Sequence, residues 1–409
     1  MEVLSALWVL LCLSFCTLFL SLAWSVHYVI TRTHIPPGIC QPRKMQFITI
    51  CMLLGRRLAV LLEKLGICHR YKTWRFFFKG IPPRKSSELV IKDLLFNGVT
   101  VRVYWPQTLP SGDTRGMVFV PGGFGMSGGI QAYERMCRFI ARESNTVVVS
   151  VGFRLAPEHP YPTQILDCYT ATVHFLKNAK EYKVDPNRVT IGGDSSGATF
   201  AAVVCQKLAT VRDLPRPRAQ ILLYPYCQML DFNLPSYQQN QSVPLLFKKR
   251  SVKLGVRYLT GTKGNVEGVM RNAHVPEELR VKYQKWVCAD HIPDEFKARG
   301  YVPVEPAPFS KELYGLMEEG LKPESSPLLA EDEVIRQLPE TFLLTCEYDV
   351  LRDDGLLYKK RLQDNHVAVT WHHLKDGFHG IMSGIDCGAL EFSNARSNLQ
   401  HVVRFLERL

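Results

Sequence analysis

A serine flanked by glycines interrupts an apolar run near the middle of the chain. The pentapeptide Gly-Asp-Ser-Ser-Gly at 193–197 follows apolar residues 189–191 and precedes a helical pattern over 198–208. Two glycines let the backbone approach its neighbours closely, so the Ser195 hydroxyl can project from a strained strand-to-helix turn. The helix N-terminus behind it offers unpaired N–H groups where an oxyanion would bind. Ser195 is predicted as a nucleophile, but this short pattern also arises by chance, so residues downstream must support it.

Short apolar runs alternate with helical patterns through most of the chain. Residues 89–105 alternate around Asn97-Gly98, which is typical of a two-residue β-hairpin. Continuous apolar strands separated by helices indicate an α/β fold, with a mainly parallel sheet covered by helices on both faces. Further strands are expected at 117–120, 146–151, 189–191, 219–224, 341–346 and 367–374, and helices at 133–143, 164–181, 198–208, 355–365 and 389–409.

Two intervals depart from this alternation. Residues 227–326 contain no clear strand pattern but many prolines and aromatic residues. So long an excursion from a βαβ pattern predicts an inserted helical cap, at about 228–325, over the sheet edge where such folds bind ligands. Residues 32–88 are expected to form a linker and N-terminal cap helices, and residues 89–409 the main domain.

The N-terminus predicts attachment to a membrane. Residues 3–26 carry no charge, and a helix of this length crosses about 30 Å of hydrocarbon. We expect a signal anchor at 1–31, with an unusually long cleaved signal as the alternative. Residues 47–62 are also apolar, but Arg56 and Arg57 interrupt them, which favours an amphipathic helix on the membrane or the domain.

The orientation signals conflict. Basic residues follow the apolar span and Glu2 precedes it, which favours a cytosolic body. Asn240-Gln241-Ser242, however, is a possible glycosylation site, which would require a lumenal body.

Composition excludes several classes of protein. The net charge of +12 permits attraction to an anionic surface, but the Lys and Arg residues look spread along the chain without an aromatic-basic cluster, so no nucleic-acid partner is expected. The twelve cysteines show no paired Cys/His spacing, so no metal site is expected. One or two disulfides stay open if the body is lumenal. No cofactor is implied.

The partners that a serine nucleophile needs follow in the expected chain order. Asp349 comes after the predicted strand 341–346, and His379 lies in the loop after the predicted strand 367–374. Hydrolytic serine sites built on such sheets use the order Ser, acid, His. Asp353 and Asp354 fall at the start of the next helix and suit its dipole, and Asp194 is expected to be structural. Ser195, Asp349 and His379 are the predicted catalytic residues.

Several longer motifs carry a family resemblance. Residues 193–197 resemble the GDSAG elbow of hormone-sensitive-lipase-like α/β-hydrolases, and residues 153–162 (FRLAPEHPYP) resemble that family's YRLAPEHPFP segment. Residues 185–189 are similar to its DPxRV lead-in, and residues 376–380 to its histidine loop. With the N-terminal anchor, the chain from residue 89 onward resembles the arylacetamide deacetylase branch. The resemblance implies the α/β-hydrolase fold and a serine esterase of the endoplasmic reticulum, single-pass type II with a lumenal body. Its substrates would be small lipophilic esters or amides.

One motif departs from the family pattern. Where the family has His-Gly-Gly-Gly, this chain has Pro121-Gly122-Gly123-Phe124. Proline lacks an N–H, but Gly122 and Gly123 are present, and with Ser196 they are expected to supply three oxyanion donors. Ser196 replaces the usual alanine, which we interpret as a mild change because the role of this position is a backbone one. The alternative is a catalytically impaired relative that binds lipid or a protein partner. Substrate identity, ester or amide preference and oligomeric state stay open.

Overall fold

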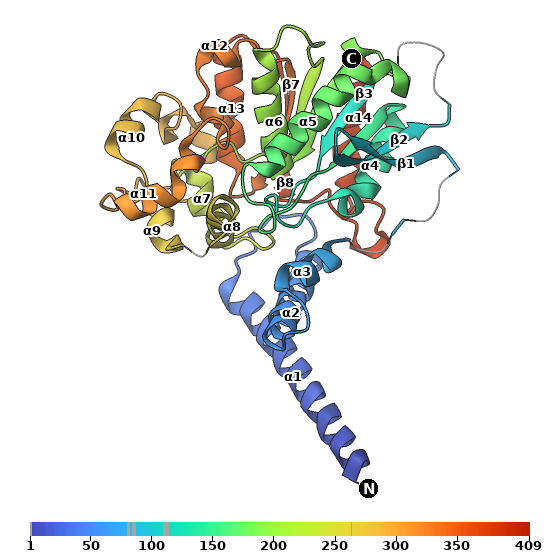
Figure 1. The fold of residues 1–409 in the computed structure, drawn as a ribbon. Coiled ribbons are helices and arrows are strands. Elements are labelled where there is room, and N and C mark those ends of the chain that lie inside the picture. Colours follow the sequence, from blue (N-terminus) through green and yellow to red (C-terminus); the bar gives the residue numbers. More distant parts are fainter. Residues whose placement is uncertain (1, 80–81, 84–86, 109–113, 263) are drawn as a thin grey trace.

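The computed structural model describes residues 2–79, 82–83, 87–108, 114–262 and 264–409, and its centre is an eight-stranded sheet (Figure 1). The strands lie in the order β1-β2-β4-β3-β5-β6-β7-β8. From β3 to β8 neighbouring strands are parallel, whereas β2 is antiparallel to both β1 and β4. Their bounds are Leu89–Phe96 (β1), Val99–Pro106 (β2), Gly116–Val120 (β3), Val147–Gly152 (β4), Val189–Asp194 (β5), Ala219–Leu223 (β6), Glu340–Tyr348 (β7) and Val369–Phe378 (β8).

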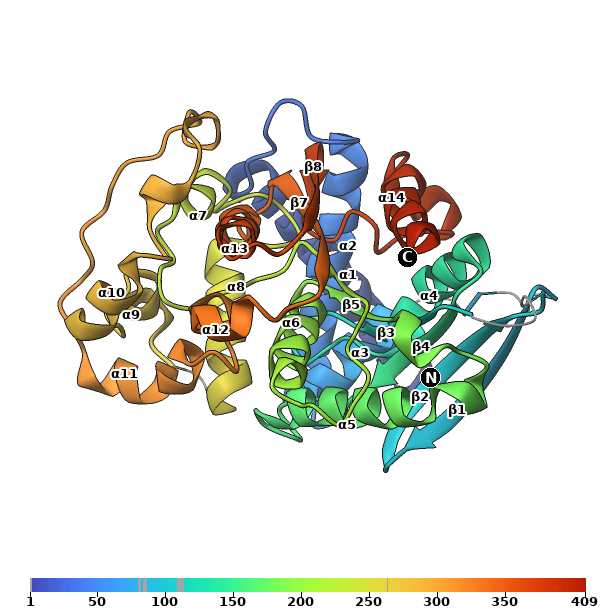
Figure 2. The same cartoon turned by 90° about the horizontal axis from the view of Figure 1, so that it is seen from above.

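Helices cover both faces of the sheet, because its central strands are apolar on both sides. Every residue of β3, β5 and β6 is buried. Figure 2 shows α4 and α14 on one face and α5, α6 and α13 on the other. The bounds are Ile130–Ser144 (α4), Thr163–Asn178 (α5), Ser196–Ala209 (α6), Arg352–Asp364 (α13) and Ala395–Arg408 (α14). The prediction of an α/β-hydrolase fold is confirmed.

Between β6 and β7 the described residues form helices and loops without a strand. Two acids at the start of α13 fasten this insertion to the sheet. Asp353 accepts a hydrogen bond from the Ser236 backbone N–H at 2.6 Å, and Asp354 accepts one from the Cys227 N–H at 2.8 Å. The inserted helices are α7 (Pro235–Gln239), α8 (Lys248–Thr260), α9 (Val266–Met270), α10 (Glu277–Gln284) and α11 (Lys311–Met317), and α12 (Asp332–Ile335) leads into β7.

Three helices precede the sheet. Helix α1 (Glu2–Arg32) projects away from the body, and α2 (Pro42–Lys64) and α3 (Arg70–Lys79) lie between α1 and the body (Figure 1). By length and composition, α1 and α2 are each apolar enough to cross a bilayer, and no residue in the apolar window of α1 is buried. The Arg57 guanidinium of α2 lies 3.6 Å from the centre of the Trp24 ring on α1. All twelve cysteines lie within the described residues, and each carries a free thiol.

Candidate active site

The turn that carries Ser195 depends on close backbone contact. Ser195 follows β5 directly and has φ 53° and ψ −127°, an unusual conformation for a residue with a side chain. A Cβ atom on Gly193 would lie 2.3 Å from the Val120 carbonyl oxygen, and one on Gly197 would lie 2.1 Å from the same oxygen. Both glycines are therefore required for β3 and α6 to approach the serine, and the elbow expected at 193–197 is present.

Ser195, His379 and Asp349 form one continuous chain of hydrogen bonds. His379 Nε2 lies 2.8 Å from Ser195 Oγ, and His379 Nδ1 lies 2.7 Å from Asp349 Oδ2. The three residues come from the ends of β5, β7 and β8, which lie at one edge of the parallel part of the sheet. With Nδ1–H donating to the carboxylate, the Nε2 lone pair is directed at the serine hydroxyl, which is the arrangement a general base needs.

Asp349 is held in place from two sides. Its side chain is fully buried, and Oδ1 accepts a hydrogen bond from the Leu351 backbone N–H at 2.9 Å. The Asn240 side-chain amide donates to the carbonyl oxygens of Asp349 and Glu347, at 2.9 and 3.1 Å. A buried residue of the insertion thus fixes the loop that carries the carboxylate.

The same contacts correct the interpretation of Asn240 as a glycosylation site. Asn240 is 0% exposed, and its amide nitrogen is occupied by the two carbonyl groups. A glycan would require this nitrogen to lie free at the surface. Asn240 is a structural residue in the folded chain, and its sequon carries no information on orientation.

In the predicted oxyanion loop, one of the three expected backbone donors is already hydrogen-bonded within the protein. The Gly122 N–H donates to Asp194 Oδ1 at 2.9 Å, so the predicted donor Gly122 is already engaged. The Phe124 N–H donates a hydrogen bond to the Ser196 hydroxyl oxygen at 2.7 Å, so the Ser196 side chain also contacts this loop. Among the described residues, the backbone N–H groups of Gly123 and Ser196 have no acceptor. These two remain as candidate oxyanion donors beside Ser195.

Asp194 has the structural role predicted for it, since its carboxylate also accepts from the Tyr133 hydroxyl at 3.0 Å. It is 1% exposed, and this desolvation raises the pKa of Asp194 from its ordinary value of 3.8 to about 6. Part of this rise in the pKa of Asp194 is offset by the hydrogen bonds from Tyr133 and Gly122 and by the nearby His379. A buried, ionisable group therefore positions Gly122, next to the remaining candidate donors.

Replacement of Asp194 by asparagine should change how stability depends on pH. The native Asp194 binds its proton more tightly than the unfolded chain does, so the native free energy of unfolding falls as pH rises from about 4 to about 6 and stays lower above. Asparagine retains an acceptor for Gly122 and carries no charge. The stability of Asp194→Asn relative to the native chain should rise by on the order of 2–3 kcal/mol between about pH 4 and pH 7. Thermal unfolding of both proteins across this pH range measures the difference in stability. If the stability of the two proteins depends on pH in the same way, the raised pKa of Asp194 is contradicted.

A second histidine near the strand ends lies outside this hydrogen-bonded chain. His373 bonds to Thr345 Oγ1 at 3.0 Å and to Glu347 at 3.1 Å, so its contacts are structural. Sequence reasoning missed Arg352, which is buried and bonds to Glu347 and to the Phe296 carbonyl beneath the insertion. The only signal in the sequence was an arginine shortly after an acid-rich strand end, and this does not identify its partners.

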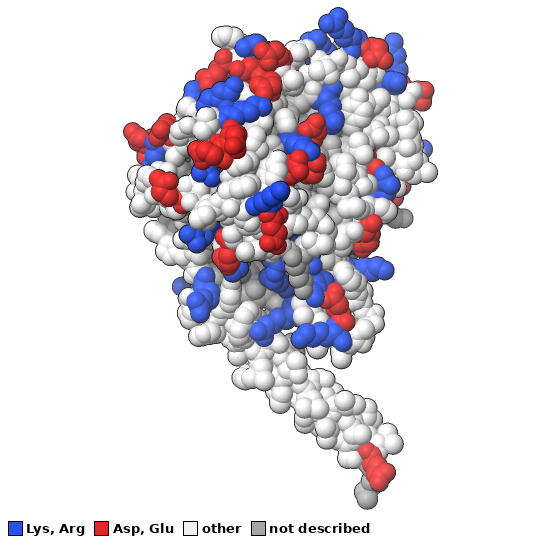
Figure 3. Space-filling model, turned by 60° about the vertical axis from the view of Figure 1, so that its left-hand side comes forward, with Lys and Arg blue, Asp and Glu red and all other residues white. Residues whose placement is uncertain are grey.

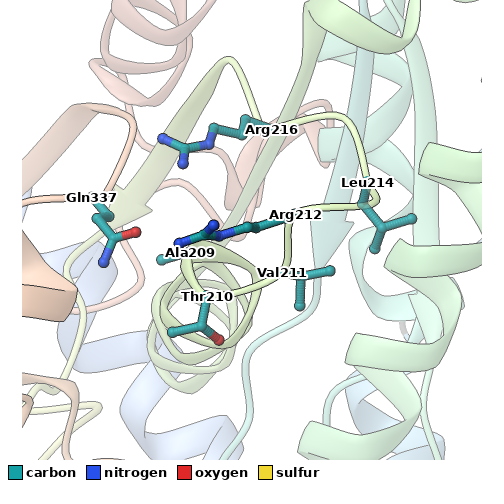
Figure 4. A pocket seen from close by; sticks show the side chains of 7 residues that line it. All are labelled: Ala209, Thr210, Val211, Arg212, Leu214, Arg216 and Gln337. Carbon is teal, nitrogen blue, oxygen red and sulfur yellow. The ribbon is translucent and has the colours of Figure 1, made fainter.

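An open surface pocket lies elsewhere. It has a volume of about 370 Å³ and sits beyond the C-terminal end of α6 (Figure 4). Ser195 lies at the other end of this fourteen-residue helix, about 20 Å away. The pocket is therefore separate from the serine site; its lining residues are Ala209, Thr210, Val211, Arg212, Leu214, Arg216 and Gln337. Among the described residues, no cluster of His, Cys, Asp and Glu has an arrangement that would hold a metal ion.

Comparison with known proteins agrees with this architecture. The family described as the alpha/beta hydrolase fold matches residues 117–274 and 301–383. Human arylacetamide deacetylase-like 4 is 41% identical over 401 residues, covering 98% of each chain. Bovine arylacetamide deacetylase is 36% identical and covers 85% of this chain and 89% of its own. Among solved structures, LAE6, an alpha/beta hydrolase from the metagenome of Lake Arreo, Spain, superposes with a TM-score of 0.65 at 23% identity, over 91% of this chain and 98% of its own.

The family match covers more than half of the chain, and the curated relatives align over nearly all of it. The chain belongs to the α/β-hydrolase family, in its esterase- and deacetylase-type arylacetamide deacetylase branch.

Proposed function

We propose that this protein is a membrane-anchored serine hydrolase that cleaves carboxylic esters or arylamides of lipophilic acyl groups. The observation that carries the proposal is the unbroken hydrogen-bond chain from Asp349 through His379 to Ser195. The relatives' names refer to an arylacetamide deacetylase, which supports acyl transfer from an ester or anilide to water.

In the first half of the proposed reaction, His379 Nε2 takes the proton of Ser195 Oγ while Oγ bonds to the substrate carbonyl carbon. The carbonyl π electrons move to oxygen, and the Gly123 and Ser196 N–H groups stabilise the resulting anion. Asp349 stabilises the imidazolium that forms. His379 then protonates the leaving alcohol or amine as its bond to carbon breaks, leaving an acyl group on Ser195.

In the second half, His379 removes a proton from water, and the hydroxide bonds to the acyl carbon. Collapse of this second tetrahedral species breaks the bond to Ser195 Oγ, which regains its proton from His379. The carboxylic acid leaves, and no cofactor or metal takes part in this sequence. The ring of Phe124, next to the candidate donor Gly123, stacks parallel on that of Tyr226 at 6.3 Å, which gives this side of the site apolar surface suited to an acyl group.

We further propose that residues 1–31 anchor the chain, and that residues 32–88 and the insertion at about 228–325 together cover the edge of the sheet that carries Ser195. The family resemblance favours a type II protein of the endoplasmic reticulum with a lumenal body. Protease treatment of sealed microsomes tests this orientation, since a lumenal body is protected until detergent is added. Digestion of the body without detergent would assign it to the cytosol.

The function is tested with the full chain in detergent micelles and p-nitrophenyl esters of short and long acyl chains. We expect release of p-nitrophenolate and covalent labelling by a fluorophosphonate, which reacts with activated serines. Absence of both turnover and labelling would contradict the proposal.

The engaged amides favour a second candidate, a catalytically impaired relative that binds lipid or a protein partner. Pro121 has no N–H group. The Gly122 N–H donates a hydrogen bond to Asp194, and the Phe124 N–H donates one to the Ser196 hydroxyl oxygen. Substitution Ser196→Ala frees the Phe124 N–H, and because one oxyanion donor is worth about 10²–10³ in turnover, kcat should rise by at least about tenfold. Ester turnover measures this. An unchanged or lower kcat would show that the hydroxyl does not restrain the site.

A further inference from the structure

Helices α2 and α3 present large apolar side chains to solvent. Phe76 is 72% exposed, and Phe77, Phe78 and Phe47 are also exposed. The connection between the two helices adds Leu65 and Ile67. Soluble proteins rarely leave so many large apolar groups uncovered on one short segment, and such surfaces mark sites of contact with a partner or a membrane.

The same segment carries most of the net positive charge of the protein. Between residues 32 and 79 there are ten Lys and Arg residues and a single acid, Glu63, so this stretch supplies nine of the twelve net charges. The basic residues are therefore not spread along the chain as expected, and α3 interleaves them with aromatic rings. In Figure 3 blue side chains gather at the base of the body, where the white stalk begins. Cationic and aromatic side chains together suit the phosphate and interfacial layer of a bilayer.

The segment is continuous with α1, which identifies the bilayer concerned. Helix α2 packs along α1, and the Arg57 guanidinium lies over the Trp24 ring at 3.6 Å. Trp24 and Arg57 would both lie at interfacial depth when α1 spans the membrane. A separate protein is not needed to cover this surface, because the lipid around α1 reaches it.

The other side of the same segment contacts the loops of the serine site. Arg75 of α3 donates to the carbonyl oxygen of Met126, in the loop after β3, at 2.8 Å, and to that of Ala156 at 2.6 Å. The Tyr348 hydroxyl, one residue before Asp349, donates to the Pro37 carbonyl at 2.8 Å. The Cys40 N–H donates to the carbonyl of Asp376, three residues before His379, at 3.0 Å.

We propose that the surface of α2 and α3 lies in the headgroup layer of the bilayer that α1 enters, so that the serine site faces the membrane and takes its lipophilic ester substrate directly from the lipid. This inference rests on the membrane attachment and hydrolase activity proposed above. The substrate class follows: acyl esters that partition into bilayers, in preference to those dissolved in water.

Photo-crosslinking in the full chain tests the location. Benzoylphenylalanine is introduced in place of Phe76, and in a matched variant in place of Val281, which is 63% exposed on α10, far from α1 (Figure 1). Both are reconstituted in vesicles of phosphatidylcholine and phosphatidylserine. We expect a phospholipid adduct by mass spectrometry at position 76 and none at 281. No lipid adduct at 76, equal adducts at both positions, or an adduct with a second copy of the chain would overturn the proposal.

Kinetics test the route of the substrate. Phe76→Ser should raise KM for a long-chain ester held in vesicles by about tenfold, and leave KM and kcat for a short soluble ester unchanged. Val281→Ser is the control and should change neither. An equal effect on both esters, or none on the vesicle-bound one, would overturn the route. If the proposed hydrolase function itself were wrong, neither ester would be cleaved, but the lipid adduct at position 76 would still form.

Discussion

Replacement of Ser195 by alanine should abolish hydrolysis, with kcat lowered by roughly 10⁶-fold or to the background rate. Ser195 Oγ is the hydroxyl that lies 2.8 Å from His379 Nε2, and alanine leaves the base without a nucleophile to activate. Labelling by a fluorophosphonate should disappear with activity. The fold should survive, since the side chain becomes smaller and the backbone bond from the Ser195 N–H to the Leu223 carbonyl remains.

The adjacent serine provides a matched control. Ser196→Ala should retain fluorophosphonate labelling, because the Ser196 hydroxyl oxygen accepts from Phe124 and does not contact His379. Persistent labelling of Ser195→Ala, or its loss in Ser196→Ala, would move the nucleophile away from Ser195. Gel fluorescence and a thermal melt of each variant distinguish lost chemistry from lost structure.

Asp349→Asn should lower kcat by about 10⁴-fold while the chain stays folded. Asparagine keeps a side-chain oxygen that can accept from the Leu351 N–H, but then its NH₂ group faces His379 Nδ1. The histidine must respond by placing its proton on Nε2, where it can no longer accept the proton of Ser195. The expected loss therefore falls on kcat, with little change in the melting temperature.

Asp376 supplies the control for this substitution. It precedes His379 by three residues, yet its carboxylate accepts from the Asn394 side chain at 2.9 Å and is not bonded to the imidazole. Asp376→Asn should keep kcat within a few-fold of the native value. If Asp349→Asn is as active as Asp376→Asn, the histidine is oriented by another group, and the proposed mechanism is wrong.

The sequence predicted what depends on local pattern and chain order. Apolar runs mark buried parallel strands, and chemistry on such sheets lies at their carboxyl ends. Ser195, Asp349 and His379 were predicted from these strand ends together with the glycine-flanked turn and the chain order Ser, acid, His. Asp349 could be separated from Asp353 and Asp354 because it lies closest to the strand end. Asp353 and Asp354 accept hydrogen bonds from backbone N–H groups of the insertion. The spacing of these acids along the sequence does not predict such contacts.

The errors came from contacts between distant parts of the chain. Gly122 and Asp194, and Phe124 and Ser196, are each 72 residues apart, so no short motif shows that these amides are engaged. The sequon at Asn240 has the correct residues, but burial against a loop more than a hundred residues later removes it from solvent. Satisfying buried polar groups is a property of the whole fold.

Several residues near the N-terminus have hydrogen-bond partners that are synthesised much later. Pro37 pairs with a residue 311 positions later, and Lys44 donates at 2.6 Å to the Glu391 carbonyl, 347 positions later. Residues 33–44 emerge from the ribosome early, but these two contacts cannot form until most of the chain has followed. Contacts of such long range form late in folding. A product that stops before Glu391 would contain Ser195, Asp349 and His379, yet Lys44 would lack its partner at Glu391 and Gln41 its partner at Ser393.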